Sequence, residues 1–318
     1  MKVTEHIRRA AGKTLFSIEV LPPLKGDNIR SLFDHLDPLM EFKPPFVDVT
    51  YHREEYVFKK RPNGLLEKIS TRKRPGTVGI CAAIQNHYHV DTVPHIICGG
   101  FSKEETENAL IDLQFLGIDN VLVLQGDAIK NEGRFTPHAD GHRYASDLVQ
   151  QVVSMNNGRY LDEDLISPQH SDFCIGVAGY PEKHFAAPNL KTDLRYLKQK
   201  VELGAEYIVT QMFFDNRHFF NFVNACREAG ITVPIIPGIK PISTKAQISV
   251  LPTIFHIDIP EELAEAIEKC RDNDAARQVG IEWTIQQSRE LMEFGVPTLH
   301  YYSMGKAEPI YSIAKALF

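Results

Sequence analysis

One carboxyl group stands inside an apolar segment near the start of the chain. Glu19 lies in the run 15–20, Leu-Phe-Ser-Ile-Glu-Val, and Pro22 and Pro23 follow it closely. Because burial destabilises an anion, we expect the pKa of the Glu19 carboxyl to be raised. A carboxylic acid with a pKa near neutral is suited to general acid catalysis. The structural alternative is a glutamate that forms an ion pair with a buried Lys or Arg.

Two further polar residues follow short apolar runs. Asp127 comes after Gly126 at the end of the run 120–124, where a glycine lets backbone N–H groups approach a ligand closely. Its carboxylate is placed to bind a ring or a ribose. Gln211 follows the run 206–210, and its amide can form two hydrogen bonds to a planar heterocycle. A Gly-Asp turn and a hydrogen-bonded core amide are the structural alternatives.

The histidine spacings give weak support to a metal site. His87 and His89 have the His-x-His spacing of metal-dependent barrel hydrolases, where such a pair ends the first strand, but here they precede the third apolar run. His138 and His142 flank Ala-Asp-Gly in a loop that holds neither in place. The sequence contains no His-Glu-x-x-His and no Gly-x-Ser-x-Gly. We therefore expect no metal, and a metal-dependent barrel hydrolase remains an alternative function.

The elements that must position these residues are short apolar runs of four to six residues, rich in Val, Ile and aromatic side chains. Runs that are apolar on both faces are typical of parallel strands buried beneath helices. They cover residues 15–20, 46–50, 93–98, 120–124, 173–178, 206–210, 233–236 and 298–301.

Helical patterns separate the runs. The segment 102–116 opens with Ser-x-x-Glu, a capping box, and Gly117 follows it. The segments 190–203, 216–229 and 274–294 are likewise each followed by a glycine and then by an apolar run. Eight strands alternating with helices predict an α/β fold of the (βα)8 TIM-barrel type. An open doubly wound sheet is the rival, but no Gly-x-Gly-x-x-Gly follows the first run.

Three segments exceed a minimal barrel. Residues 54–75 are expected to form an excursion such as a hairpin, residues 156–172 an inserted loop and residues 251–272 an extra helix. The sequence shows no internal repeat and no linker. We therefore expect one catalytic domain, residues 1–318, with these extra helices and loop insertions.

The composition narrows the class of protein. The chain has 318 residues with 35 Lys and Arg against 41 Asp and Glu, a formal charge of −6. This balance offers no basic footprint for nucleic acid. No run of about 18 apolar residues predicts a membrane helix, and the polar N-terminus lacks a signal-peptide core. Five isolated cysteines indicate reduced thiols and a cytoplasmic protein. The sequence leaves a homo-oligomer open.

Eight motifs, taken in order, resemble methylenetetrahydrofolate reductase, a flavin-dependent enzyme of one-carbon and methionine metabolism. The likeness runs from about residue 15 to the C-terminus, and it is the order of the set that makes it specific. The motifs are Ser17-Ile18-Glu19-Val20-Leu21-Pro22-Pro23, Val49-Thr50-Tyr51, Pro94-His95-Ile96-Ile97-Cys98, Gln125-Gly126-Asp127, Tyr144-Ala145-Ser146-Asp147-Leu148, Tyr180-Pro181-Glu182-x-His184, Thr210-Gln211-x-Phe213-Phe214-Asp215 and Ile236-Pro237-Gly238-Ile239.

The resemblance implies a barrel that holds FAD and a ping-pong reaction. NADH or NADPH reduces the flavin and leaves. The 5,10-methylenetetrahydrofolate then occupies the same face and is reduced to 5-methyltetrahydrofolate. By resemblance, Glu19 is the general acid that protonates the bridging nitrogen of the folate, and Asp127 is the carboxylate beside the flavin and the pterin. The choice between NADH and NADPH stays open.

The resemblance also assigns binding residues by position. Flavin contacts fall on Tyr51, His95, Gln125, Gly126, Asp127, Ala145, Tyr180, His184, Ala187, Asp193 and Lys200. Nicotinamide contacts fall on Thr50 and Gln211, and folate contacts on Asp127, Gln211, Gln247 and Lys306.

The sequence departs from the family pattern at three places. Gln125 stands where the family usually has Arg, which removes a positive charge near the flavin. Lys306 stands where some members have Arg, and Val20-Leu21 replace an aromatic pair. A flavin- or folate-binding barrel without turnover is therefore a further alternative. The resemblance ends with the barrel, so we expect no regulatory domain.

Overall fold

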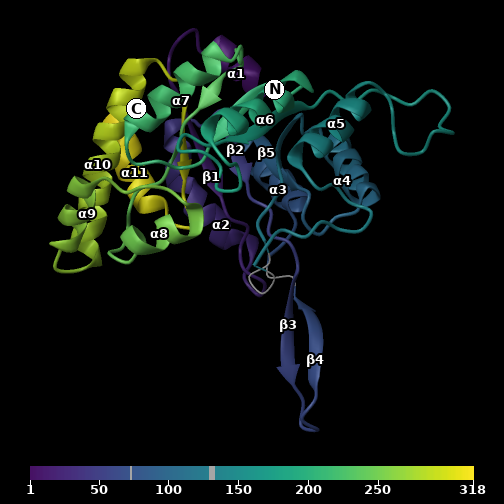
Figure 1. Ribbon diagram of the computed structural model, residues 1–318, viewed down its shortest axis with the longest axis horizontal. Helices are drawn as coiled ribbons and strands as arrows, with labels where there is room; N and C mark the ends of the chain where they lie inside the picture. Colours follow the sequence, from purple (N-terminus) through teal and green to yellow (C-terminus); the bar gives the residue numbers. More distant parts are fainter. Residues whose placement is uncertain (72–73, 129–132) are drawn as a thin grey trace.

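The computed structural model describes residues 1–71, 74–128 and 133–318, and parallel strands at its centre close into a barrel (Figure 1). The barrel strands are β1 (Leu15–Val20), β2 (Phe46–Val49), β5 (Asp91–Ile97), β6 (Asn120–Leu124), β7 (Cys174–Gly179), β8 (Tyr207–Thr210), β9 (Ile235–Ile236), β10 (Gly238–Ile239) and β11 (Thr298–Tyr302).

The ring closes through a divided strand. β9 pairs with β8, and β10 pairs with β11, so the two short strands on either side of Pro237 together fill one position. The described residues thus contain the eight strand positions that the sequence predicts, and the (βα)8 expectation is confirmed. The seventh run differs from its predicted bounds, since it begins later and continues past Pro237, whose missing N–H interrupts the ladder.

Helices surround the barrel on its outside (Figure 1). The capping box at Ser102 and Glu105 is present, and the four glycines predicted to end helices, at 117, 204, 230 and 295, all have positive φ. The helices are α2 (Ile29–Leu36) with the 3-10 turn η1 (Asp37–Phe42), α3 (Thr77–Tyr88), α4 (Lys103–Phe115), α5 (Ala145–Asn156), α6 (Leu190–Glu202), α7 (Asn216–Glu228), α10 (Asn273–Phe294) and α11 (Ala307–Leu317).

A separate apolar cluster fills the amino-terminal end of the barrel interior. Phe46, Val93, Leu122 and Tyr207 point inward from their strands and are buried. The first helix, α1 (Val3–Arg9), covers this end, and Val3 packs into the cluster while its N–H donates to the Asn120 side chain. The amino-terminal end of the barrel interior is therefore closed, which leaves the carboxyl ends of the strands for polar chemistry.

The three predicted additions have different outcomes. The hairpin is confirmed as β3 (Glu55–Lys60) and β4 (Leu66–Thr71), which project away from the barrel as an arm (Figure 1). Residues 72 and 73 of that segment lie outside the described residues. The segment 157–172 is an extended loop, as predicted. Where one extra helix was expected, the chain forms two, α8 (Gln247–Phe255) and α9 (Glu261–Glu268), because Pro260 begins a second helix.

No helix of the described chain has the length and apolar character that crossing a membrane requires. All five cysteines are described and free, and four of them are buried.

Candidate active site

Glu19 lies inside the barrel near the carboxyl end of β1. Parallel pairing places it opposite Asp48 of β2 on one side and Tyr302 of β11 on the other. Its Oε2 atom is 3.5 Å from Nε2 of His95 in β5, and the same His95 atom is 3.5 Å from Oδ2 of Asp48. Three ionisable side chains from three strands therefore form one cluster in the barrel interior.

The environment of Glu19 favours its neutral form. Burial, opposed by the charge of His95 and assisted by Asp48, raises the pKa of the Glu19 carboxyl to about 7. Burial also lowers the pKa of His95, which favours a neutral imidazole. The sequence-based expectation of a raised carboxyl pKa is confirmed, and the basic partner of Glu19 is a histidine instead of a Lys or Arg.

Asp48 and His300 extend this cluster across the interior. Asp48 is 1% exposed, and burial raises the pKa of its carboxyl to about 7, with His300 opposing the shift. His300 Nδ1 is 2.8 Å from the Ser17 hydroxyl and 4.0 Å from Asp48 Oδ1. Neither carboxylate oxygen of Asp48 has a hydrogen-bond partner among the described residues. Such an arrangement is costly unless protons are shared within it.

Tyr302 closes the interior beside Glu19. Its hydroxyl donates to the Thr210 carbonyl at 2.6 Å, and the Thr210 hydroxyl accepts from the Gly238 N–H at 3.0 Å. A Cβ atom on Gly238 would lie 2.2 Å from the Thr210 carbonyl oxygen and 2.3 Å from the Tyr302 hydroxyl. The glycine of the Pro-Gly-Ile motif is therefore required by the space that Tyr302 occupies.

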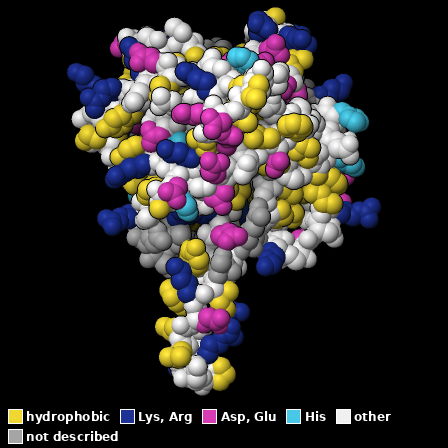
Figure 2. Space-filling view, turned by 90° about the vertical axis from the view of Figure 1, so that its right-hand side faces the viewer, with side chains coloured by type: hydrophobic (Ala, Val, Ile, Leu, Met, Phe, Trp, Pro, Cys, Tyr) yellow, Lys and Arg dark blue, Asp and Glu magenta, His cyan; other side chains and the backbone are white. Residues whose placement is uncertain are grey.

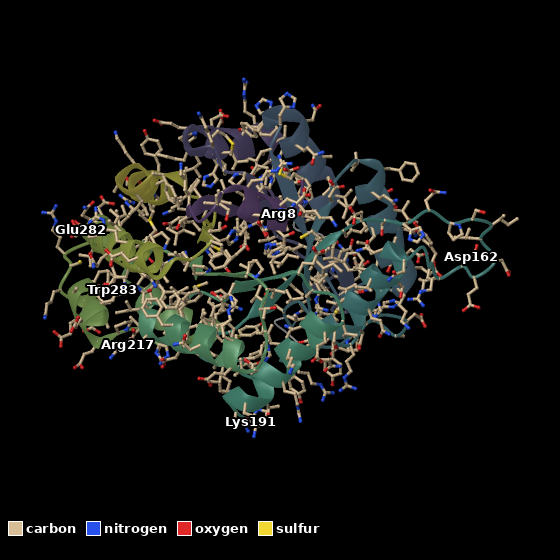
Figure 3. The ribbon with its side chains drawn as sticks, turned by 90° about the horizontal axis from the view of Figure 1, so that it is seen from above. Arg8, Asp162, Lys191, Arg217, Glu282 and Trp283 are labelled. Carbon is tan, nitrogen blue, oxygen red and sulfur yellow. The ribbon has the colours of Figure 1, made fainter. Side chains whose placement is uncertain are left out.

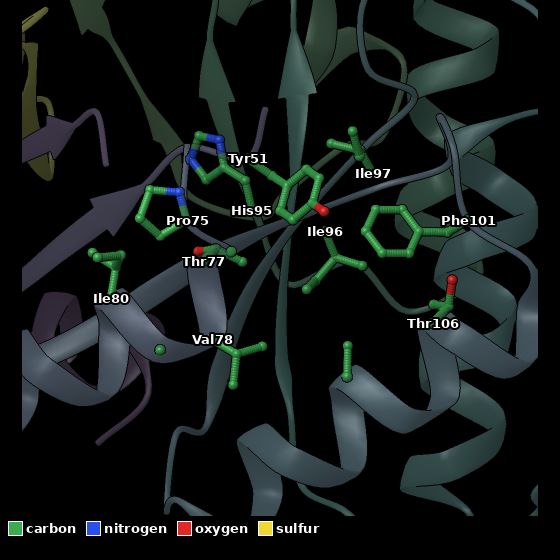
Figure 4. A pocket seen from close by; sticks show the side chains of 13 residues that line it. Tyr51, Pro75, Thr77, Val78, Ile80, His95, Ile96, Ile97, Phe101 and Thr106 are labelled. Carbon is green, nitrogen blue, oxygen red and sulfur yellow. The ribbon is translucent and has the colours of Figure 1, made fainter. Parts of the chain in front are cut away.

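An apolar cavity of about 360 Å³ lies beside β5, between the first turns of α3 and α4 (Figure 4). Tyr51 and His95 line it together with Ile97 and Phe101. The rings of Tyr51 and Phe101 meet edge to face with centroids 4.9 Å apart. His95 belongs both to this cavity and to the Glu19 cluster, so the cavity lies within reach of the buried acid.

The segment after β6 contains three predicted site residues, one of which contacts a residue that lines this cavity. Gly126 has φ +84°, and a Cβ there would lie 3.2 Å from Ile97, which lines the cavity. Gln125 donates from its side chain to the Arg143 carbonyl at 2.8 Å. Asp127 is exposed. The two carboxyl groups thus occupy different environments, since the Glu19 side chain is only 13% exposed and Asp127 meets solvent.

The segment after β7 forms a second predicted group. The rings of Tyr180 and His184 meet edge to face at 4.6 Å, and the His184 N–H donates to Asp193 at 2.9 Å. Lys200 donates to the Ala178 carbonyl at 2.8 Å. Burial lowers the pKa of Lys200 to about 8, and the charge of Asp193 opposes the shift.

Three remaining positions of the flavin and nicotinamide set have local backbone roles. The N–H of Thr50 donates to the Val20 carbonyl, which joins the ends of β1 and β2. Ala145 begins α5, and Ala187 is buried with its carbonyl accepting from Lys183. Thr50 and Ala187 come directly after strands or in the loops that follow them, while Ala145 opens the helix after β6.

The predicted folate residues differ in how free their side chains are. Gln211 is half-buried at the end of β8, and its side-chain oxygen accepts from the Met212 N–H. Gln247 accepts from the N–H groups of Ser243 and Thr244, so its carbonyl oxygen is already used in shaping the loop before α8. Lys306 is exposed at the start of α11.

The His-x-His pair lies away from the carboxyl ends of the strands. His87 is in the last turn of α3 and stacks on Phe33 with ring centroids 4.2 Å apart, while His89 ends that helix. Among the described residues no group of three or more His, Cys, Asp or Glu side chains is arranged to hold a metal ion. The motif behind the hydrolase alternative is thus at the amino-terminal end of β5.

Three residues of the site were missed by the sequence-based prediction. Asp48 and His300 are ionisable residues within apolar runs, the same signal that identified Glu19, and that signal applied to every strand would have found both. Lys240 follows β10 and is 5% exposed; burial lowers the pKa of its ammonium to about 8, and the charge of Lys306 adds to this effect.

Comparison with known proteins gives a consistent result. The family model described as methylenetetrahydrofolate reductase matches residues 2–318. "Methylenetetrahydrofolate reductase (NADH) 1" of Arabidopsis thaliana is 34% identical over 316 residues, which cover 96% of this chain and 48% of the relative. "Probable methylenetetrahydrofolate reductase (NADPH)" of Caenorhabditis elegans is 32% identical over 305 residues, covering 95% of this chain and 42% of the relative.

A bacterial relative and a solved structure extend the comparison. "5,10-methylenetetrahydrofolate reductase" of Escherichia coli is 28% identical over 316 residues and covers 99% of this chain and 94% of the relative. A Clostridium thermocellum protein, described as uncharacterized and as binding two copies of 5-methyl-5,6,7,8-tetrahydrofolic acid, has the same fold. It has a TM-score of 0.58 and 16% identity, and the match covers 98% of this chain and 97% of that one.

The chain spans about half the length of the plant and nematode relatives and nearly all of the E. coli relative. Because the family model matches almost every residue, the chain belongs to the methylenetetrahydrofolate reductase family.

Proposed function

We propose that this member of the methylenetetrahydrofolate reductase family reduces 5,10-methylenetetrahydrofolate to 5-methyltetrahydrofolate, with FAD as cofactor and NADH or NADPH as reductant. The observation that carries the proposal is Glu19, a largely buried carboxylic acid with a pKa of about 7 at the carboxyl end of a barrel strand. The reaction needs such a group, because a nitrogen of the folate's methylene bridge must be protonated before its bond to the methylene carbon breaks.

The predicted flavin-binding residues fit FAD. The Lys200 ammonium carries three N–H donors, and its one hydrogen bond within the described residues uses the Ala178 carbonyl, which leaves donors for a phosphate. Tyr51 and His95 border an apolar cavity, and Gly126 presents backbone without a side chain next to it. Gln125, Asp127, Ala145, Tyr180, His184, Ala187 and Asp193 complete the proposed set. When bound, FAD supplies the two-electron chemistry that links the nicotinamide to the folate.

Glu19 moves the proton. Its neutral carboxyl donates to the bridging nitrogen of the folate, the bond from that nitrogen to the methylene carbon breaks, and an iminium forms on the substrate. The hydride then reduces the methylene carbon to the methyl group. Burial and Asp48 keep the proton on Glu19, because both disfavour its ionisation, while the charge of His95 opposes this effect.

The other polar groups orient the substrates. Asp127 and Gln211 offer hydrogen-bond partners to a planar pterin ring, and Gln211 with Thr50 faces the nicotinamide. Gln211 is assigned to both the nicotinamide and the folate. The two substrates therefore occupy the same site in turn, which is the basis of the ping-pong order. Lys306, Gln247 and the buried Lys240 are assigned to the remainder of the folate, whose carboxylates attract lysine ammonium groups.

The proposal extends to the organisation of the protein. Residues 1–318 act as one catalytic barrel in the cytoplasm, where five free cysteines are stable. The relatives are named for NADH in one case and for NADPH in another, so the preferred reductant is left to experiment.

The test is the visible absorption spectrum of the purified protein, followed without oxygen. We expect a flavin spectrum that bleaches on addition of NADH or NADPH and returns on addition of methylenetetrahydrofolate. A protein that stays colourless after FAD is added would refute the flavin site.

A second candidate function rests on Gln125, whose neutral side chain is held by the Arg143 carbonyl. It is a flavin- or folate-binding barrel without turnover. The same experiment separates the two, since a binding protein would take up folate and FAD but would not regain its colour with the folate.

A further inference from the structure

The arm made by β3 and β4 has one face that carries apolar and basic residues and no acidic one. In the antiparallel pairing Phe58 lies opposite Lys68, and Lys60 lies opposite Leu66, so these four side chains share a face with Tyr56. The Lys68 ammonium lies 3.9 Å from the centre of the Tyr56 ring. The acidic Glu67 pairs with Lys59 and therefore lies on the opposite face.

This face is open to solvent. Phe58 is 60% exposed and Leu66 is 66% exposed, and Figure 2 shows apolar and basic side chains along the projecting arm. The arm forms its own two-stranded sheet, separate from the barrel sheet. A hairpin of two strands is marginally stable in water by itself, and exposed apolar side chains that gather on one face mark an interaction surface.

A second projection has the opposite charge. The loop 157–172 carries Asp162, Glu163 and Asp164 at its tip, all exposed, followed by Leu165 and Ile166. Ile166 is 96% exposed. Asp162 lies at the outer edge of the molecule in Figure 3.

The base of the loop is fixed although its tip projects. The Leu161 N–H donates to Glu107 of α4 at 2.8 Å, and the Tyr160 hydroxyl donates to the Gln169 carbonyl at 2.9 Å. The Asp164 N–H donates to the Asp162 side chain at 2.9 Å, which shapes the tip. The acidic and apolar side chains are thus presented by an anchored loop.

The arm and the loop cannot meet within one copy of the chain. The arm follows the carboxyl end of β2, whereas the loop precedes the amino end of β7, so they leave opposite ends of the barrel. Figure 1 shows their tips pointing in different directions and far apart. Two copies placed side by side with their barrels antiparallel, about a two-fold axis, bring each arm to the level of the other copy's loop.

We propose that two copies of this chain form a two-fold dimer in which the apolar and basic face of each arm docks on the acidic and apolar loop tip of the other. Lys60 and Lys68 meet Asp162, Glu163 and Asp164, while Phe58 and Leu66 cover Leu165 and Ile166. Opposite charges steer the encounter and set the register, and apolar burial holds the contact.

A second copy fits the arm better than a nucleic acid does. The face carries only two lysines beside three large apolar side chains, and the chain as a whole has a formal charge of −6. A surface of this kind has too little positive charge to follow a phosphate backbone. It matches a compact acidic and apolar tip, which the same chain supplies.

The experiment measures mass by sedimentation velocity on the purified full chain and on two charge-reversed variants. The arm variant is Lys60→Glu with Lys68→Glu, and the loop variant is Asp162→Lys with Asp164→Lys. We expect a dimeric wild type and, for each variant alone, a dimer dissociation constant raised about ten-fold or more, because like charges then face each other. An equimolar mixture of the two variants regains the dimer, since both of its contacts again join opposite charges.

Controls separate this contact from a general charge effect. Lys13→Glu with Lys191→Glu reverses two exposed lysines elsewhere and leaves the dimer intact. Thermal unfolding of every variant stays close to the wild type, because the altered side chains are exposed. The wild-type dimer also weakens as salt is raised, since exposed charges are screened.

A monomeric wild type overturns the proposal. So does an arm variant that dimerises as tightly as the wild type, or a mixture of the two variants that stays monomeric. Binding of single-stranded nucleic acid by the wild type, lost in the arm variant while the mass stays monomeric, would assign the arm to the other class of partner. None of these readouts depends on the reaction proposed above.

Discussion

His95 Nε2 and Glu19 Oε2 lie 3.5 Å apart inside the barrel, where burial favours the neutral form of both groups. Burial raises the pKa of Glu19 to about 7 and lowers the pKa of His95. The pair therefore approaches a neutral acid beside a neutral imidazole. This is the state in which a proton can be given to a substrate without leaving a large unpaired charge behind.

Replacing the acid should separate the two half-reactions. We expect Glu19→Gln to keep flavin reduction by the nicotinamide and to slow folate reduction by about 10²–10⁴-fold, because only the second step needs the proton. Anaerobic stopped-flow absorbance measures each step. The matched control is Glu293→Gln, an exposed glutamate of α10. A Glu19→Gln protein with normal folate reduction would remove Glu19 from the general-acid role.

The pH profile should report the same group. The neutral form of Glu19 is the active one, so the folate half-reaction should be fast below pH 7 and fall as pH rises through the Glu19 pKa of about 7. Asp48 raises that pKa, so Asp48→Asn should move the falling limb to lower pH. A limb that does not move in Asp48→Asn, measured over pH 5–9, would show that Asp48 does not act on Glu19.

The free energy of unfolding should depend on pH through Glu19 with the opposite sign to that of an ordinary ion-paired carboxylate. Between the unfolded pKa of about 4.5 and the folded pKa of about 7, the folded Glu19 holds a proton that the unfolded chain has released. Folding therefore weakens as pH rises through this window, by up to about 3 kcal/mol. Glu19→Gln should raise the free energy of unfolding at pH 8 relative to wild type, and less so at pH 5. Denaturant titrations at both values check this, and equal effects at pH 5 and 8 would contradict it.

The divided strand should be intolerant of a side chain. In Gly238→Ala the new Cβ meets the Thr210 carbonyl at 2.2 Å, so Tyr302 and Thr210 must move, at a cost of about 1–3 kcal/mol or more. Gly79→Ala is the control, because a Cβ there meets nothing within 4 Å and alanine favours the helix by about 1 kcal/mol. Thermal unfolding compares them, and a Gly238→Ala protein as stable as Gly79→Ala would contradict the close packing.

A positive charge at position 125 should strengthen the binding of FAD. We expect Gln125→Arg to lower the FAD dissociation constant by about ten-fold, because a guanidinium adds charge and paired donors near the flavin. Titration of the apoprotein with FAD, followed by flavin fluorescence, measures it. Gln199→Arg, at an exposed position of α6, is the control for net charge. Equal affinities in both variants would dismiss Gln125 as a weak point of the site.

Much of the fold was predictable because its signals are local. Apolar runs, the Ser102 capping box and the glycines after helices each depend on neighbours within one turn or one strand. Glu19 was identified for the same reason, since one carboxyl group in a six-residue apolar run is unusual wherever the run ends up. The hairpin at 55–71 and the loop at 157–172 followed from composition alone.

The partners of Glu19 were decided by the tertiary structure. Asp48, His95 and His300 are separated from Glu19 by between 29 and 281 positions, and they meet because barrel closure fixes the register of four strands. Register depends on how all eight positions fit around one ring, which no single segment encodes. The chain thus determined which residues carry the chemistry, and the closed barrel determined which of them act together.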